Sequence, residues 1–152
     1  MIPKIKTGIA AFDELIGGGL PDNTITLIYG PPKTGKSVFC YHFLQQAMSD
    51  DEICLYLMTD YNLFQLEEKM MQFNWLIHEY LQKEMLYVLD IASGSIGASL
   101  KETATFKMSS PQNPTEIVSK IIDDLQLIYQ KTHRFRSVLD STTTLFSFNS
   151  PI

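Results

Sequence analysis

The chain has few cysteines, no surplus of basic charge and no long apolar run, and each of these absences excludes a class of protein. Its two cysteines, Cys40 and Cys54, stand in apolar segments without the spacing of a metal site or a redox pair. We interpret them as buried thiols of a reducing compartment. No stretch approaches the roughly 18 apolar residues of a membrane span, and the N-terminus lacks a signal-peptide pattern. We therefore expect a cytoplasmic protein without a membrane partner.

Basic charge is scarce as well. The 12 Lys and Arg residues stand against 17 Asp and Glu residues, which gives a formal net charge of -5. Such a chain has no overall basic field for nucleic acid or an anionic membrane, so its charge does not support nucleic acid as a partner. One local cluster of basic residues follows the last long helical segment, and we interpret it as solvating the end of that helix, with a contact to a neighbouring subunit or to nucleic acid as the alternative. The cluster consists of Lys131, His133, Arg134 and Arg136.

The remaining composition is typical of one globular unit, because 45% of the 152 residues are hydrophobic and 19% are charged. Apolar strand-like segments alternate with segments of helical spacing, which predicts a single α/β domain over residues 1–152 with a parallel sheet and flanking helices. We predict strands at 24–29, 53–58, 85–89 and 135–139, and helices at 37–48, at 63–73 and beyond a cap at Thr115. Residues 92–114 are rich in Gly, Pro, Ser and Thr, and we expect a long loop that is either functional or mobile.

The segment between the first predicted strand and the first long helix has the pattern G-x-x-x-x-G-K-[S/T] of a phosphate-binding P-loop. Its glycines let backbone N–H groups close around phosphate oxygens, and the helix that follows points its positive dipole end at them. Lys36 adds a full charge, and Ser37 offers a hydroxyl to Mg²⁺. The pattern predicts a site for a nucleoside triphosphate, with ATP and Mg²⁺ as its ligands. The loop consists of Gly30, Pro31, Pro32, Lys33, Thr34, Gly35, Lys36 and Ser37.

Two acidic residues follow predicted strands and are expected at the carboxyl end of the same sheet, where ligands of such folds bind. Asp140 follows the strand at 135–139 and suits a Walker B aspartate, which holds a water on Mg²⁺. Asp60 follows the strand at 53–58 and is the acid placed to orient an attacking water. The alternative for both residues is a structural role as a turn or helix-cap residue.

These residues resemble the KaiC-like branch of the RecA/RadA superfamily of P-loop ATPases, over most of the chain. The resemblance rests on residues 7–21 with their Gly17-Gly18-Gly19 run, on the P-loop and on the sequence Val138-Leu139-Asp140-Ser141. It implies ATP binding, often hydrolysis, and assembly into rings or filaments with nucleotide between the subunits. The resemblance therefore implies a homo-oligomer or a larger protein partner.

The chain departs from the family pattern after its second predicted strand. Members of the family usually place a pair of acids there, commonly two glutamates, to activate water. This chain instead reads Thr59-Asp60-Tyr61, so that one acid is shortened to Asp60 and the other is replaced by Tyr61. Aspartate is shorter than glutamate by one methylene, and a misplacement near 1 Å can lower a rate on the order of 10²-fold. The chain is therefore either a weak or partner-dependent ATPase or a nucleotide-sensing regulatory module with little turnover. An accessory role in DNA recombination rests on superfamily analogy alone.

A second departure concerns the sheet. The RecA-like core normally continues well beyond its Walker B strand, whereas this sequence extends to residue 152. In that topology the next strand lies between the Walker A and Walker B strands. We therefore expect a partial domain that lacks C-terminal core strands, with a gap in the sheet and unpaired strand edges on either side of it.

Overall fold

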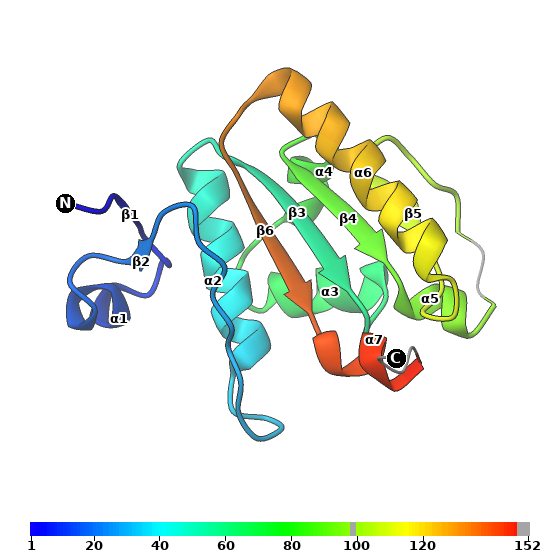
Figure 1. The fold of residues 1–152 in the computed structure, drawn as a ribbon, viewed down its shortest axis with the longest axis horizontal. Coiled ribbons are helices and arrows are strands. Elements are labelled where there is room, and N and C mark those ends of the chain that lie inside the picture. Colours follow the sequence, from blue (N-terminus) through cyan, green and yellow to red (C-terminus); the bar gives the residue numbers. More distant parts are fainter. Residues whose placement is uncertain (98–99, 149–152) are drawn as a thin grey trace.

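A four-stranded parallel sheet lies between two layers of helices in the computed structural model, which describes residues 1–97 and 100–148 (Figure 1). The strands occur in the order β5-β4-β3-β6, and the register places Met58 opposite both Asp90 and Asp140. The carboxyl ends of three strands therefore meet at one edge. This arrangement confirms the predicted α/β fold. The strands are Ile53–Met58 (β3), Leu86–Asp90 (β4), Phe106–Met108 (β5) and Phe135–Asp140 (β6).

Helices cover both faces of the sheet and bury two separate hydrophobic cores. Residues of β3 alternate between these cores: Tyr56 packs with helices α2, α3 and α4, and Leu55 packs with α6 on the opposite face. A strand buried on both sides needs apolar side chains at every position, which explains the uninterrupted sequence of β3. Among the described residues, no helix combines the length and the hydrophobicity needed to cross a membrane. The helices are Lys36–Ser49 (α2), Leu63–Met71 (α3), Ile77–Gln82 (α4) and Pro114–Lys131 (α6).

The cap of α6 lies two residues before the predicted one. Asn113, not Thr115, caps the helix, because its side-chain oxygen accepts a hydrogen bond from the backbone N–H of Glu116 at 3.1 Å. Pro114 then stands at the first helical turn, where its missing N–H costs nothing.

Small elements complete the chain. The N-terminal part forms an antiparallel pair of two-residue strands around a short helix, and it lies beside α2 (Figure 1). Gly19 is required there, since its φ is +127° and an added Cβ would lie 2.1 Å from the carbonyl oxygen of Ile5. These elements are Lys4–Ile5 (β1), Ala10–Leu15 (α1), Leu20–Pro21 (β2), Ala92–Ser95 (α5) and Thr142–Phe148 (α7).

The strand predicted at 24–29 is wrong. This segment joins no sheet, and its side chains are exposed, including Leu27 at 77% and Tyr29 at 88%. Apolar and β-branched residues favour a strand, but a strand also needs a neighbour for its backbone hydrogen bonds. Within the described ranges β6 pairs with β3 alone and stands at the end of the sheet. The expected gap with an unpaired edge on either side is therefore not formed, because residues 24–29 supply no second strand. Residues 24–29 lead from β2 to the loop at the start of α2 (Figure 1).

The loop predicted at 92–114 needs a correction too, because this segment contains α5 and β5. Phe106 and Met108 are buried on β5, which pairs with β4. A strand of three residues is too short to show an alternating pattern, and only its pairing with β4 makes it recognisable. Residues 98–99 of the predicted loop lie outside the described residues.

The two cysteines belong to the packed interior. Cys54 is buried on β3 and Cys40 is half-buried on α2. Burial raises the pKa of each thiol to about 12, so neither forms a reactive thiolate at neutral pH. The predicted buried thiol is thus confirmed for Cys54 and holds in part for Cys40.

Candidate functional site

The predicted P-loop is an exposed segment directly before the 14-residue helix α2. Gly35 has a φ of +92° and precedes the first helical residue, Lys36. Glycine adopts this left-handed conformation without steric cost, which allows the chain to turn abruptly into the helix. The first N–H groups of α2 have no intrahelical acceptors, and together with the helix dipole they favour an anion at this end. The N-terminal end of α2 is therefore suited to an anionic group.

Lys36 folds back over this loop. Its Nζ donates to the carbonyl oxygen of Gly30 at 2.8 Å and to that of Pro31 at 2.6 Å. The hydroxyl of Thr34 donates to the Pro31 carbonyl at 2.8 Å, which tightens the loop further. Both partners of the ammonium are neutral acceptors, and an anionic oxygen forms a stronger hydrogen bond with it. The ammonium is thus placed to exchange these carbonyls for phosphate oxygens.

The two residues predicted to hold Mg²⁺ are brought together by a third residue, Tyr61. The Oη atom of Tyr61 lies 2.7 Å from Ser37 Oγ and 3.0 Å from Asp140 Oδ2. Ser37 belongs to the first turn of α2, Asp140 ends β6, and Tyr61 follows β3. Three elements therefore converge on one small group of oxygen atoms beside the P-loop.

Two further tyrosines belong to this group. Tyr56 donates its hydroxyl to Asp140 Oδ2 at 3.2 Å, and its ring packs edge to face on that of Tyr41. The hydroxyl of Tyr41 is buried and finds no hydrogen-bond partner within the described part of the chain. Burial is the main cause that raises the pKa of all three phenols, so they stay protonated at neutral pH and remain donors. The sequence pattern missed Tyr41 and Tyr56, because a tyrosine in an apolar segment is typical of any core.

Asp60 lies at the same end of the sheet but has a different set of partners. Its carboxylate accepts hydrogen bonds from the hydroxyls of Thr59 at 3.2 Å, Ser141 at 3.1 Å and Thr144. Ser141 directly follows Asp140, so Asp60 is connected to the Asp140 segment through its neighbour. The residue is exposed, and an oriented, exposed carboxylate can hold a water molecule.

The oxygen atoms at this position fit a magnesium ion. Mg²⁺ prefers hard oxygen ligands and is usually held by one or two protein groups, with phosphate oxygens and water completing its shell. The Ser37 hydroxyl can supply such a ligand, and the Asp140 carboxylate can orient a water on the ion; both groups lie within hydrogen-bonding distance of one phenol oxygen. Among the residues that the structure describes, no group of three or more His, Cys, Asp or Glu residues can hold a metal by itself. The fit is therefore to an ion that arrives with a phosphate ligand.

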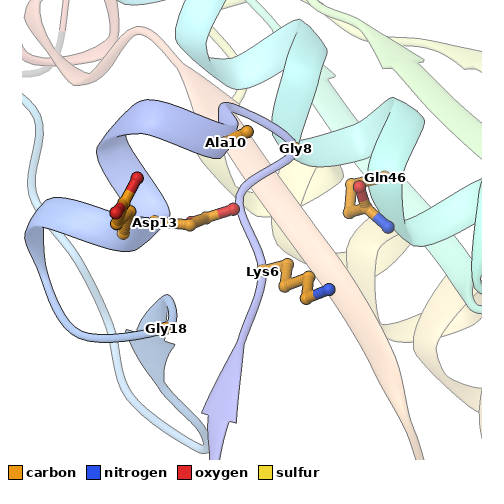
Figure 2. A pocket seen from close by; sticks show the side chains of 7 residues that line it. Lys6, Gly8, Ala10, Asp13, Gly18 and Gln46 are labelled. Carbon is orange, nitrogen blue, oxygen red and sulfur yellow. The ribbon is translucent and has the colours of Figure 1, made fainter.

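A hollow of about 350 Å³ lies elsewhere, between the N-terminal segment and α2 (Figure 2). One of its two acidic wall residues, Asp13, is already engaged: its carboxylate accepts hydrogen bonds from the backbone N–H of Thr7 at 2.9 Å and from the Thr7 hydroxyl at 2.8 Å. These bonds anchor the N-terminal segment, so we assign this hollow a structural role. None of the predicted site residues lines it. The lining residues are Lys6, Gly8, Ala10, Asp13, Glu14, Gly18 and Gln46.

Three residues of the basic cluster at the end of α6 form ion pairs with acidic residues of the same chain. Lys131 pairs with Glu84, and Arg134 pairs with Glu52 at 3.0 Å. Arg136 is buried and donates to Glu52 at 2.7 Å. The predicted role at a helix end therefore holds for Lys131, whereas Arg136 is an internal structural residue. Charges already balanced in this way do not favour nucleic acid as a partner.

Comparisons with known proteins relate the sequence to one family of ATPases. The sequence model of the family described as "ATPase: KaiC" matches residues 5–151. A UPF0273 protein of Aeropyrum pernix is 29% identical over 96% of this chain and 57% of its own length. UPF0273 protein MJ1359 of Methanocaldococcus jannaschii is 31% identical over 98% of this chain and 60% of its own length. The circadian clock oscillator protein KaiC of Prochlorococcus marinus is 27% identical over 95% of this chain and 27% of its own length. The chain thus spans about three-fifths of the length of the UPF0273 relatives.

Proposed function

We propose that this chain, which belongs to the KaiC family of ATPases, binds ATP with Mg²⁺ on residues 30–37. The observation that carries the proposal is the meeting of Ser37 and Asp140 at one oxygen atom of Tyr61, at the N-terminal end of α2. A glycine loop on a helix terminus accounts for an anion, and a hydroxyl with a carboxylate beside it accounts for a divalent cation. A nucleoside triphosphate with its magnesium ion is the ligand that requires both.

In this proposal each residue acts through its own chemistry. The backbone N–H groups of the loop and the Lys36 ammonium hold phosphate oxygens. Ser37 binds the cation through its hydroxyl, and Asp140 orients a water on it. The bound magnesium ion neutralises part of the triphosphate charge. Asp60 is the acid that we assign to the attacking water, since three hydroxyls fix its carboxylate at the same end of the sheet.

A second candidate function is a nucleotide-sensing module that regulates a larger partner or an oligomer with little turnover. It is favoured by Tyr61, which stands where the family usually has a second acidic residue, because a phenol protonated at neutral pH cannot accept a proton from water as a carboxylate can. Steady-state release of inorganic phosphate separates the two candidates. Turnover that Asp60→Asn removes supports the ATPase, and binding without phosphate release supports the sensor.

Equilibrium titration with a fluorescent ATP analogue tests the proposed binding. We expect saturable binding that unlabelled ATP displaces and that Mg²⁺ strengthens, because the cation completes the contact between the phosphates and Ser37. Lys33→Ala serves as a control. Lys33 is an exposed residue of the same loop, and its side chain forms no hydrogen bond or ion pair with other described residues. A folded chain that shows no saturable binding at millimolar nucleotide would contradict the proposal.

A further inference from the structure

The phenol oxygen of Tyr61 lies between Ser37 and Asp140, the two residues assigned to the cation. This Oη atom is within 3.0 Å of an oxygen of each residue. A phenol has one proton, and an ionised carboxylate only accepts hydrogen bonds. The phenol therefore donates to Asp140 and accepts from the serine hydroxyl. The single oxygen of Tyr61 thus forms one hydrogen bond with Ser37 and one with Asp140.

The ring of Tyr61 is itself held in place. The Nζ atom of Lys69, on α3, lies 4.5 Å from the ring centroid, which is the distance of a cation–π contact. The residue that follows, Asn62, caps α3 in a reciprocal pair of 3.0 Å hydrogen bonds with Gln65. The backbone next to Tyr61 is thus fixed by a helix start, which places the hydroxyl beside Ser37 and Asp140.

We propose that Tyr61 controls how strongly nucleotide binding depends on Mg²⁺, because its hydroxyl has to leave Ser37 and Asp140 before these residues can hold the cation. This inference rests on the proposed function and deepens it. The contact lowers the affinity for ATP with Mg²⁺, but it engages Ser37 and not the Lys36 ammonium or the glycines of the loop, so it leaves the affinity for metal-free ATP unchanged. Tyr61 is therefore a residue that sets cation dependence at the site.

The test compares two matched variants, Tyr61→Phe and Tyr56→Phe. Each removes one phenol oxygen that contacts Asp140 Oδ2, but only Tyr61 also contacts Ser37. The dissociation constant of the fluorescent ATP analogue is measured with Mg²⁺ and with EDTA for the wild type and both variants. We expect Tyr61→Phe to increase the ratio of the EDTA value to the Mg²⁺ value about tenfold, which corresponds to two hydrogen bonds to be broken. Tyr56→Phe should change this ratio less than about threefold, since its hydroxyl does not bridge the two ligands.

The outcomes separate the inference from the proposed function. An unchanged ratio in Tyr61→Phe, with binding intact, overturns the inference and leaves the proposed function standing. An equal increase in Tyr56→Phe also overturns it, because the effect then belongs to Asp140 alone. If the wild type and both variants show no binding with Mg²⁺ or with EDTA, the inference and the proposed function are both overturned. Ser37→Ala, alone and together with Tyr61→Phe, gives a second check. In the Ser37→Ala background the change at Tyr61 should alter the ratio less than in the wild type, because only the bond to Asp140 remains to be broken, and an undiminished effect would overturn the inference.

Discussion

Replacing Lys36 by alanine is expected to lower the affinity for ATP about 100-fold, which is close to 2.7 kcal/mol. Lys36 carries a full positive charge, and its ammonium contacts the carbonyl oxygens of Gly30 and Pro31 in the glycine loop. Its ammonium is placed to exchange these neutral acceptors for anionic phosphate oxygens. Charge-assisted hydrogen bonds contribute about 1.5–3 kcal/mol each, so their loss should dominate the affinity. Titration with the fluorescent ATP analogue measures the change.

The control for this prediction is Lys33→Ala, in the same loop. It removes the same charge from the chain but leaves Lys36 and its two carbonyl contacts in place. We expect its affinity to stay within about threefold of the wild type, because an exposed charge at this distance is screened by salt. Circular dichroism confirms that both variants are folded. Equal losses in the two variants would mean that only the net charge of the loop matters, and would contradict the role assigned to Lys36.

Replacing Arg136 by alanine is expected to lower the free energy of unfolding by about 3 kcal/mol or more, because it breaks a buried ion pair. Arg136 joins three parts of the chain: its guanidinium donates to the Lys6 carbonyl at 2.6 Å and to Glu52 at 2.7 Å, and it lies 4.9 Å from the ring centroid of Phe43. Its side chain is only 4% exposed. Removing it leaves a poorly solvated carboxylate and an unpaired carbonyl. Urea unfolding followed by circular dichroism measures the loss.

Arg134→Ala is the matched control for this loss. Arg134 contacts the other oxygen of the same Glu52 at 3.0 Å, but its side chain is 59% exposed. An exposed ion pair contributes about 1 kcal/mol or less, so this variant should unfold at nearly the wild-type urea concentration. If both variants lost the same free energy of unfolding, burial of Arg136 would have no energetic consequence. Our description of Arg136 as an internal structural residue would then be wrong.

The sequence predicted the parts of the fold whose signals are local. The apolar run of β3 has to be buried on both faces, and the register then brings Asp140 level with Met58 at the end of the sheet. The P-loop was recognisable because each of its chemical groups has a fixed spacing. Strand β5 and the cap at Asn113 escaped prediction, since the first is defined by pairing with β4 and the second by one side-chain rotamer.

Other features depend on contacts between distant residues, which a pattern along the chain does not contain. The segment at 24–29 has strand-like composition, but no neighbour among the described residues supplies its hydrogen bonds. Tyr61 was recognised as a replacement for an acid, whereas its position between Ser37 and Asp140 follows from how β3, β6 and α2 pack. Arg136 looked like part of an exposed cluster, because its burial depends on the N-terminal segment that crosses it. The candidate site could thus be predicted from the sequence, but the contact of Tyr61 with Ser37 and Asp140 could not.

Amide hydrogen exchange, measured by mass spectrometry with and without ATP and Mg²⁺, tests the location of the nucleotide most directly. Residues 31–35 are exposed in the free chain, so their amides should exchange rapidly. The account predicts that ATP with Mg²⁺ slows exchange in peptides that contain residues 30–38, because phosphate oxygens accept those N–H groups, and in the peptide that contains Asp140. Protection confined to residues 6–18, beside the hollow of Figure 2, at nucleotide concentrations that saturate the chain would contradict it.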